Sequence, residues 1–177
     1  MGADLTAIFS HDLVLSKIDD IVKELNLLNI QELYEETSQE IWKISPDRSW
    51  GEGDIHIYGP HSLKLLFGEK CCQLEFPMRW MSFVDNENEV EVEEVRMVCR
   101  RISQLLKADF AIYIPDTAYT SSGVYGKVYE AVAIDTIVSW LLVNCGRPAS
   151  KISDIFDVAL GEIDQNGYFI DYFSLSL

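Results

Sequence analysis

Hydrophobic positions along the chain repeat with two different periods, which predict both helices and strands. Near the N-terminus, the apolar and β-branched run ADLTAIF at residues 3–9 predicts a strand. Two stretches follow, 14–28 and 30–43, in which apolar residues recur every three or four positions. These stretches predict two helices, and Ser10 or Asp12 is the expected N-cap of the first.

The spacing then changes to the two-residue period of a strand. The runs DIHIYG, SLKLLFG and CCQLEFP within residues 54–77 alternate apolar and polar positions, with Gly-Pro and Gly-Glu turn signals between them. They predict an antiparallel meander with one face toward solvent, where His56 lies because it alternates with Ile55 and Ile57. The next segment, RWMSFV at 79–84, is expected to be a fourth strand or a loop over the core.

The second half of the chain returns to helical spacing. Residues 86–107 predict an amphipathic helix, and FAIYI at 110–114 predicts a buried strand. Segment 124–145 is apolar nearly all round, which predicts one buried helix or two shorter ones. A short helix is expected over 152–159. The Asn-Gly pair at 166–167 then predicts a hairpin that pairs ALGEID with YFIDYF.

Together these elements predict an α+β fold, in which an antiparallel β-meander packs against several helices as a single pair of layers. The length of 177 residues suits one domain, so residues 1–177 are expected to form it. The longest apolar stretch is interrupted by Asp135 and is too short to span a bilayer, so no membrane partner is expected.

Charge and cysteine content narrow the class of partner and the compartment. The chain has 29 acidic and 14 basic residues, a net charge of −15, which repels the phosphates of nucleic acids. A basic protein partner is the expected alternative, although the charge could serve solubility alone. The four cysteines lack the spacing of a zinc or redox motif, and the N-terminus does not resemble a signal peptide, so a cytoplasmic location is expected.

Acidic residues gather at the start of the helix expected over 86–107. On a helix, Glu87, Glu91 and Glu94 share one face, and Glu93 lies beside them. This cluster is a candidate surface for binding a basic partner, and a solvated helix start is the alternative interpretation.

Two further candidates for partner contact lie elsewhere in the chain. Asp164 belongs to a C-terminal stretch that has no lysine or arginine after Lys151. Trp50, within DRSWGEG, could anchor a partner from a loop, or the loop could fold back and cover the core.

A polar run after the strand FAIYI is the strongest candidate for small-molecule chemistry. Asp116, Tyr119 and several hydroxyl side chains lie within residues 116–123. The protein could therefore be a small ligand-binding domain or a hydrolase that uses this polar loop as its site. Hydrolysis with Ser121 or Ser122 as the nucleophile would need a histidine base, and none of the three histidines belongs to a known motif. The run is better interpreted as a proline stop and a polar turn, in which Asp116 bonds its own backbone and, with Tyr119, could contact a partner. No catalytic residue, metal or cofactor is assigned.

Three stretches, FAIYIPD, IDTIVSWLLVNCGRP and YFIDYF, resemble segments of small acidic bacterial proteins, some of them immunity proteins that neutralise toxins. The resemblance covers the C-terminal third and carries over no functional residue. It implies a non-catalytic protein whose acidic surface covers the active site of a basic toxin or enzyme. A self-assembling subunit, for example a homodimer, is the remaining hypothesis.

Overall fold

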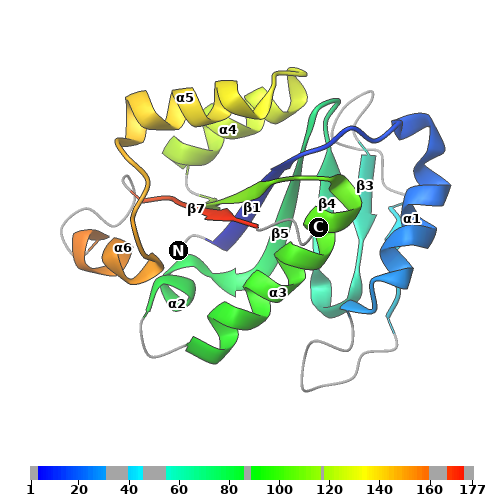
Figure 1. Cartoon of the computed structure of the whole chain (residues 1–177), viewed down its shortest axis with the longest axis horizontal. Helices are drawn as coiled ribbons and strands as arrows, with labels where there is room; N and C mark the ends of the chain where they lie inside the picture. Colours follow the sequence, from blue (N-terminus) through cyan, green and yellow to red (C-terminus); the bar gives the residue numbers. More distant parts are fainter. Residues whose placement is uncertain are drawn as a thin grey trace.

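Seven antiparallel strands form one sheet in the computed structural model of the chain (Figure 1). The structure describes residues 4–30, 40–45, 55–85, 89–116, 118–159 and 167–173, and for 118–123 and 156–159 the backbone only. The strands are β1 (Asp4–Ser10), β2 (Lys43–Ile44), β3 (Ile55–Tyr58), β4 (Lys64–Phe67), β5 (Cys71–Arg79), β6 (Phe110–Pro115) and β7 (Phe169–Tyr172). Their order across the sheet is β2-β3-β4-β5-β1-β6-β7.

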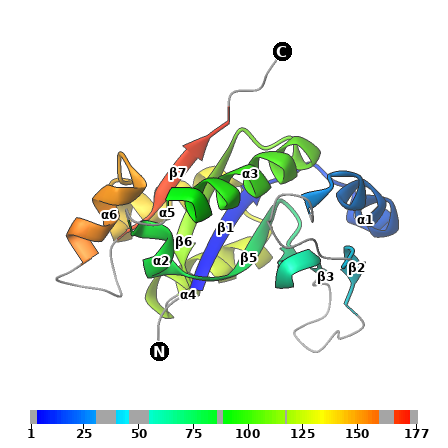
Figure 2. The ribbon, with the colours of Figure 1, turned by 90° about the horizontal axis from the view of Figure 1, so that it is seen from below.

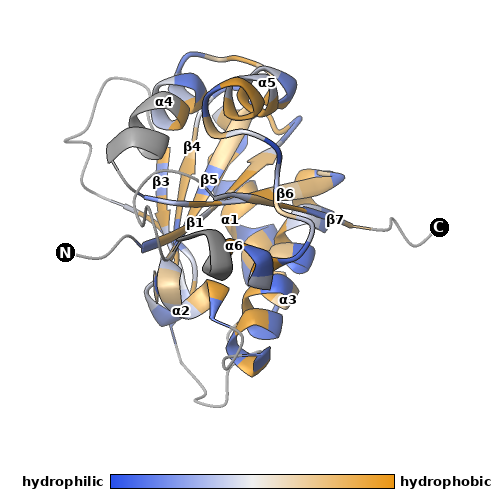
Figure 3. Cartoon of the chain, turned by 90° about the vertical axis from the view of Figure 1, so that its left-hand side faces the viewer, coloured by the Kyte–Doolittle hydropathy of each residue, from blue (hydrophilic) through white to orange (hydrophobic). Residues whose placement is uncertain are grey.

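Helices cover both faces of this sheet. They are α1 (Ile18–Leu27), α2 (Trp80–Val84), α3 (Glu89–Leu106), α4 (Ala118–Tyr129), α5 (Ile134–Cys145) and α6 (Ile152–Ala159), with 3-10 turns at Leu15–Lys17 and Pro60–Ser62. Helices α2, α3 and α6 lie on one side, which we call the α3 face, and α4 and α5 lie on the other, the α4 face (Figure 3). Helix α1 lies beside β2 and α3 at one end of the molecule (Figure 1).

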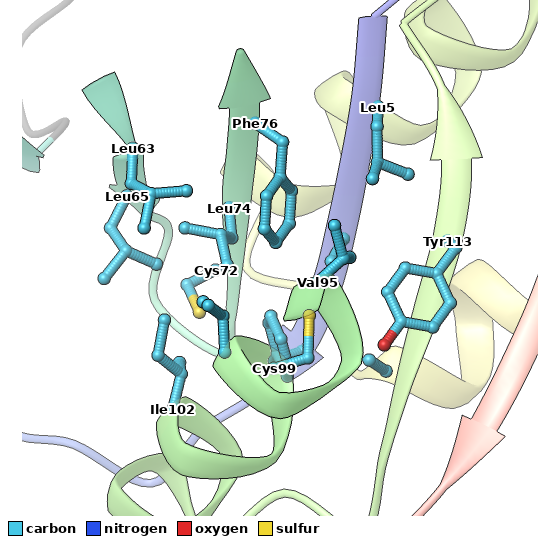
Figure 4. Close-up of a cluster of buried hydrophobic side chains, with 14 of the residues drawn as sticks. Leu5, Leu63, Leu65, Cys72, Leu74, Phe76, Val95, Cys99, Ile102 and Tyr113 are labelled. Atoms are coloured by element: carbon cyan, nitrogen blue, oxygen red, sulfur yellow. The ribbon is translucent and has the colours of Figure 1, made fainter. Parts of the chain in front are cut away.

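The α+β class predicted from the sequence is therefore confirmed, with a second helical layer in addition to the single pair of layers expected. Alternation along the strands divides the apolar residues between the two faces. Figure 4 shows the core of the α3 face, where Leu74 and Phe76 of β5 lie opposite Val95 and Ile102 of α3. On the α4 face, the buried residues of the sheet and of α4 and α5 form a second core: Ile8, Ile112, Ile114, Val124, Val128, Ile137 and Leu141.

The long, regular patterns predicted their elements well. Several elements lie where they were expected. They are the first strand, the three-stranded meander, the helix predicted over 86–107 (α3), the strand β6 and the short helix α6. Each of these segments places its apolar residues on one buried side at the spacing of its own secondary structure, so the local pattern and the tertiary packing agree.

Two segments adopt a different structure from the one predicted. RWMSFV is neither a strand nor a loop: it contains the helix α2, which begins directly after β5 and buries Trp80, Phe83 and Val84. The three residues follow helical spacing, but five residues are too few to reveal that period. Residues 31–39 of the predicted second helix lie outside the described residues, and its end is wrong because residues 43 and 44 form β2.

Other predictions about caps and exposure were also wrong. Neither Ser10 nor Asp12 is the N-cap of α1, because a 3-10 turn precedes the helix and Lys17 takes that position. His56 was expected on a solvent-facing surface, but it is only 7% exposed. The sheet was expected to have one open face, whereas α4 and α5 cover part of it.

The apolar segment 124–145 divides into two helices, and α4 begins six residues earlier than this segment, at Ala118. Helix α5 is not buried all round, because Leu142 is 50% exposed and Val143 is 82% exposed. In the predicted C-terminal hairpin, ALGEID begins at residue 159, which lies at the end of α6, and 160–166 lie outside the described residues. Strand β7 pairs with β6.

Candidate functional site

The acidic start of α3 is the first candidate site, and the structure gives its acids different environments. Glu91 is exposed. Glu93 is engaged in two ion pairs, with Arg100 at 2.6 Å and with Arg96 at 3.5 Å. Glu94 is partly buried. A partner's positive charge would therefore meet Glu91 more readily than Glu93, whose charge is already compensated.

A cavity of about 310 Å³ opens beside this end of α3, between α2, α3 and α6, and we call it the α3 groove. Figure 2 shows these three helices side by side on the α3 face. The apolar residues of the groove's lining, which we call the apolar floor, are Phe83, Val84, Val92, Ile152 and Phe169. Phe83 and Val84 are fully buried, so Val92, Ile152 and Phe169 provide the accessible apolar surface. The polar lining of the groove includes Asp85, Glu89, Arg96, Ser150, Lys151 and Ser153.

The arginine of the groove is compensated within the protein. Arg96 donates from Nε to Oδ2 of Asp171 at 2.7 Å and from Nη2 to Oδ1 at 2.9 Å. Asp171 is only 5% exposed, and the hydroxyl of Tyr113 also donates to its Oδ2, at 3.4 Å. Arg96 is paired with a buried carboxylate, and the other charged residues of the described lining are the acids Asp85 and Glu89 and the base Lys151, so this part of the groove is negative.

Two of the other predicted contact residues, Asp116 and Tyr119, are described, and neither is on the elements that form this groove. Glu87, Trp50 and Asp164 lie outside the described residues. Tyr119 is on the first turn of α4, the helix that packs on the opposite face of the sheet from α3 through Val124 and Val128. Asp116 lies between β6 and α4. The described candidates, on α3 and at the junction of β6 and α4, therefore lie in separate parts of the fold.

Residues 118–123 form the first turns of α4, so the polar turn predicted for them is wrong. Asp116 Oδ1 accepts the N–H of Asp4 at 2.6 Å, and the N–H of Asp116 donates to the carbonyl of Asp4 at 2.9 Å. These bonds extend the pairing of β1 and β6 by one residue, and α4 begins two residues later. The expected turn is thus replaced by a strand end followed almost at once by a helix.

Asp116 borders a second cavity of about 190 Å³, at the end of the sheet on the α4 face, which we call the Asp116 cleft. Four of its residues lie in one row across β3, β4, β5 and β1: Tyr58, Lys64, Glu75 and Thr6. The cleft is also lined by Asp4, Leu5, Ser62, Phe76 and Pro77. No histidine lines it among the described residues, so the histidine base that a hydrolase would need beside Asp116 is not found there.

A hydrogen-bonded network forms one wall of this cleft. Glu75 Oε1 accepts from Gln73 Nε2 at 3.0 Å and from the hydroxyl of Tyr125, on α4, at 3.4 Å. Burial, and then the charge of Glu75, raise the pKa of Tyr125, so its hydroxyl stays protonated and donates. Lys64 Nζ lies 3.3 Å from Glu75 Oε2. The network docks α4 on the sheet and fixes Lys64 at the edge of the cleft.

Comparison with known proteins gives no assignment: no family model, no curated protein and no solved structure matches the chain. The resemblance to immunity proteins therefore stays a prediction. Within the described ranges, no three histidine, cysteine, aspartate or glutamate side chains are grouped as a metal site would require. No helix in the same ranges has the length and apolar character needed to cross a membrane.

Sequence reasoning missed both cavities, for different reasons. Asp85 and Glu89 belong to the acidic run that was singled out, but α2 was not recognised, so its contribution of Phe83 and Val84 to the groove was not foreseen. Lys64 and Glu75 occupy polar positions of the meander, and their alternation was a usable signal that they share a face. Only the strand order brings Asp116 to the same place.

Proposed function

We propose that this chain is a non-catalytic binding protein that holds a basic protein partner in the α3 groove. One observation carries the proposal: at the start of α3, the acids Asp85, Glu89 and Glu91 lie next to the apolar floor of the groove. Such a combination suits an amphipathic segment, whose apolar side chains enter the groove while its lysines or arginines meet Asp85, Glu89 and Glu91.

The charge of the whole chain supports the same partner class. A net charge of −15 attracts a cationic protein over several ångströms and speeds the encounter before contact is made. The apolar floor then supplies affinity that charge alone does not, because apolar side chains of the partner leave water when they enter the groove. Val90, 71% exposed next to Glu89 and Glu91, adds apolar surface beside the acids.

A cationic toxin or enzyme is the partner that the resemblance to immunity proteins implies, and we propose that binding takes place in the cytoplasm. All four cysteines are free thiols. Burial raises the pKa of Cys71 to about 11 and raises that of Cys72 and Cys99 as well, so these thiols stay protonated and unreactive near neutral pH. The proposed function therefore uses surface complementarity, and these three buried thiols take no part in it.

The proposal predicts that affinity depends on both parts of the groove. A helical peptide with lysines on one side and leucines on the other should bind in the low micromolar range or tighter, as measured by fluorescence anisotropy at low ionic strength. A scrambled peptide of equal charge has no apolar side, and it should bind at least about tenfold more weakly. Charge reversal by Glu89→Lys with Glu91→Lys should weaken binding of the amphipathic peptide by about tenfold or more.

The matched control reverses two exposed acids on the opposite side of the sheet, Glu130→Lys with Asp135→Lys, and changes the net charge by the same amount. This control should reduce affinity much less than the groove variant. Equal losses for the two pairs would show that only the total charge matters. Equal affinity for the amphipathic and the scrambled peptide would show that the apolar floor takes no part.

A further inference from the structure

The Asp116 cleft has a charge distribution that the docking of α4 does not explain. The network beneath α4 uses both oxygens of Glu75, which accept from Gln73, Tyr125 and Lys64. Glu75 is therefore satisfied by the protein itself. Beyond these contacts, groups that can bind a ligand lie at the two ends of the cleft. Lys64 can donate hydrogen bonds at one end, and the carboxylates of Asp4 and Asp116 can accept them at the other.

The end of the cleft at β3 and β4 offers hydrogen-bond donors. Lys64 Nζ carries three protons, and its ion pair with Glu75 uses one of them. Its side chain is 22% exposed, so its charge is partly withdrawn from water and held near the cleft. Tyr58 and Ser62 line the same end, and Lys64 Nζ lies 6.0 Å from the centre of the Tyr58 ring. An anionic group placed here would meet the positive charge of Lys64.

The end at β1 and β6 offers acceptors. Asp4 Oδ1 takes a hydrogen bond from Arg79 Nη1 at 2.8 Å, and Asp116 Oδ1 takes the N–H of Asp4. Each carboxylate has a second oxygen with further capacity to accept. With two carboxylates and one arginine, this end is negative and suits an ammonium group.

The spacing of the strands limits the length of a ligand that reaches both ends. Lys64 is on β4 and Asp4 on β1, two strands apart in the sheet order, which is about 10 Å at the backbone because neighbouring strands are about 4.8 Å apart. The two charges of a single α-amino acid lie too close together to meet both ends. The volume of about 190 Å³ is below the range of drug-sized pockets, so the ligand is small.

We infer that the Asp116 cleft binds a small zwitterion of about dipeptide length, with its ammonium at Asp116 and Asp4 and its carboxylate at Lys64. An ω-amino acid of similar length has the same chemistry. Glu75 then acts as a positioning residue, because it holds Lys64 in place without contacting the ammonium. This site lies on the opposite face from the α3 groove and does not depend on the proposed function.

Three ligands of one chain length test the inference by isothermal titration calorimetry on the full chain: 5-aminopentanoate, pentanoate and pentylamine. The first has both charges, and each of the others lacks one. The zwitterion should bind at least about tenfold tighter than either analogue, because each end adds a charge-assisted hydrogen bond. If it binds no tighter than the analogues, or does not bind, the inference is wrong whatever the behaviour of any variant.

Two variants test which charge of the ligand binds at each end of the cleft. Asp116→Asn keeps an oxygen that accepts from Asp4, and it should weaken the zwitterion about tenfold while leaving pentanoate unchanged. Lys64→Gln should weaken the zwitterion and pentanoate but not pentylamine. Asp135→Asn, an exposed acid on α5, is the control for lost charge. An equal loss of affinity with Asp135→Asn and Asp116→Asn would overturn the assignment.

Discussion

A buried histidine shows how single residues tie distant turns of this fold together. His11 is 5% exposed; its Nε2 bonds the carbonyl of Gly68 at 2.9 Å, and its Nδ1 accepts the N–H of Leu13 at 3.2 Å. One ring nitrogen must therefore carry a proton and the other must not, which is the neutral form. Burial lowers the pKa of His11, in agreement with this pattern, although the nearby Asp12 acts in the opposite direction.

This arrangement predicts a pH-dependent contribution to stability. The unfolded chain binds a proton at His11 near pH 6.5, whereas the folded chain resists it, so the contribution is complete above pH 6.5 and is lost as pH falls through the lower folded pKa. The free energy of unfolding, measured with urea between about pH 7.5 and 5, should fall more steeply for the wild type than for His11→Gln. Parallel pH profiles would contradict the neutral assignment.

Gly68, the partner of His11, has a role that the sequence revealed only in part. The pattern marks it as a turn between two strands, which is confirmed. A Cβ atom at this position would lie 1.9 Å from the carbonyl oxygen of Val128, so the turn also lies directly against the end of α4. A turn signal is local, whereas this contact joins residues that are far apart in the chain, and no local pattern reports it.

At the scale of elements, the length of the regular apolar pattern decided which helices were predicted correctly. The buried stripe of α3 covers several turns and identified the helix. It consists of Val95, Val98, Cys99, Ile102 and Leu106. The first turns of α4 contain threonine, serine and glycine, which favour turns over helices, and the helix was predicted to begin later. Packing of Val124 and Val128 against the sheet overrides that local preference.

The same α3 anchors the last strand of the sheet through the pair of Arg96 and Asp171. Removal of the buried carboxylate by Asp171→Ala leaves a partly buried guanidinium without its main partner, so the free energy of unfolding should fall by about 2–4 kcal/mol in urea titrations. The double variant Arg96→Leu with Asp171→Leu removes both charges and should recover part of this loss.

Glu93→Gln is the control for this prediction. Its carboxylate pairs with Arg96 and Arg100, but its side chain is 48% exposed, so its loss should change stability by no more than about 1 kcal/mol. If Asp171→Ala costs no more than Glu93→Gln, the pair does not hold β7 in the sheet.

At the scale of the whole molecule, the strand order could not have been predicted from local patterns. The first strand lies between β5 and β6, and β7 is added at the edge from the other end of the chain. Such pairings join residues far apart in the chain, as between Thr6 and Ile114. They also place the two cavities, because the α3 groove and the Asp116 cleft lie on opposite faces of the sheet.

The central claim is that the acidic groove, and not the overall charge, captures a basic partner. Stopped-flow association of the amphipathic lysine–leucine peptide tests it most directly, with ionic strength raised from about 0.02 to about 0.2 M. The account predicts that Glu89→Lys with Glu91→Lys slows association at low salt and flattens its salt dependence more than Glu130→Lys with Asp135→Lys does. Identical salt profiles for the two variants would contradict it.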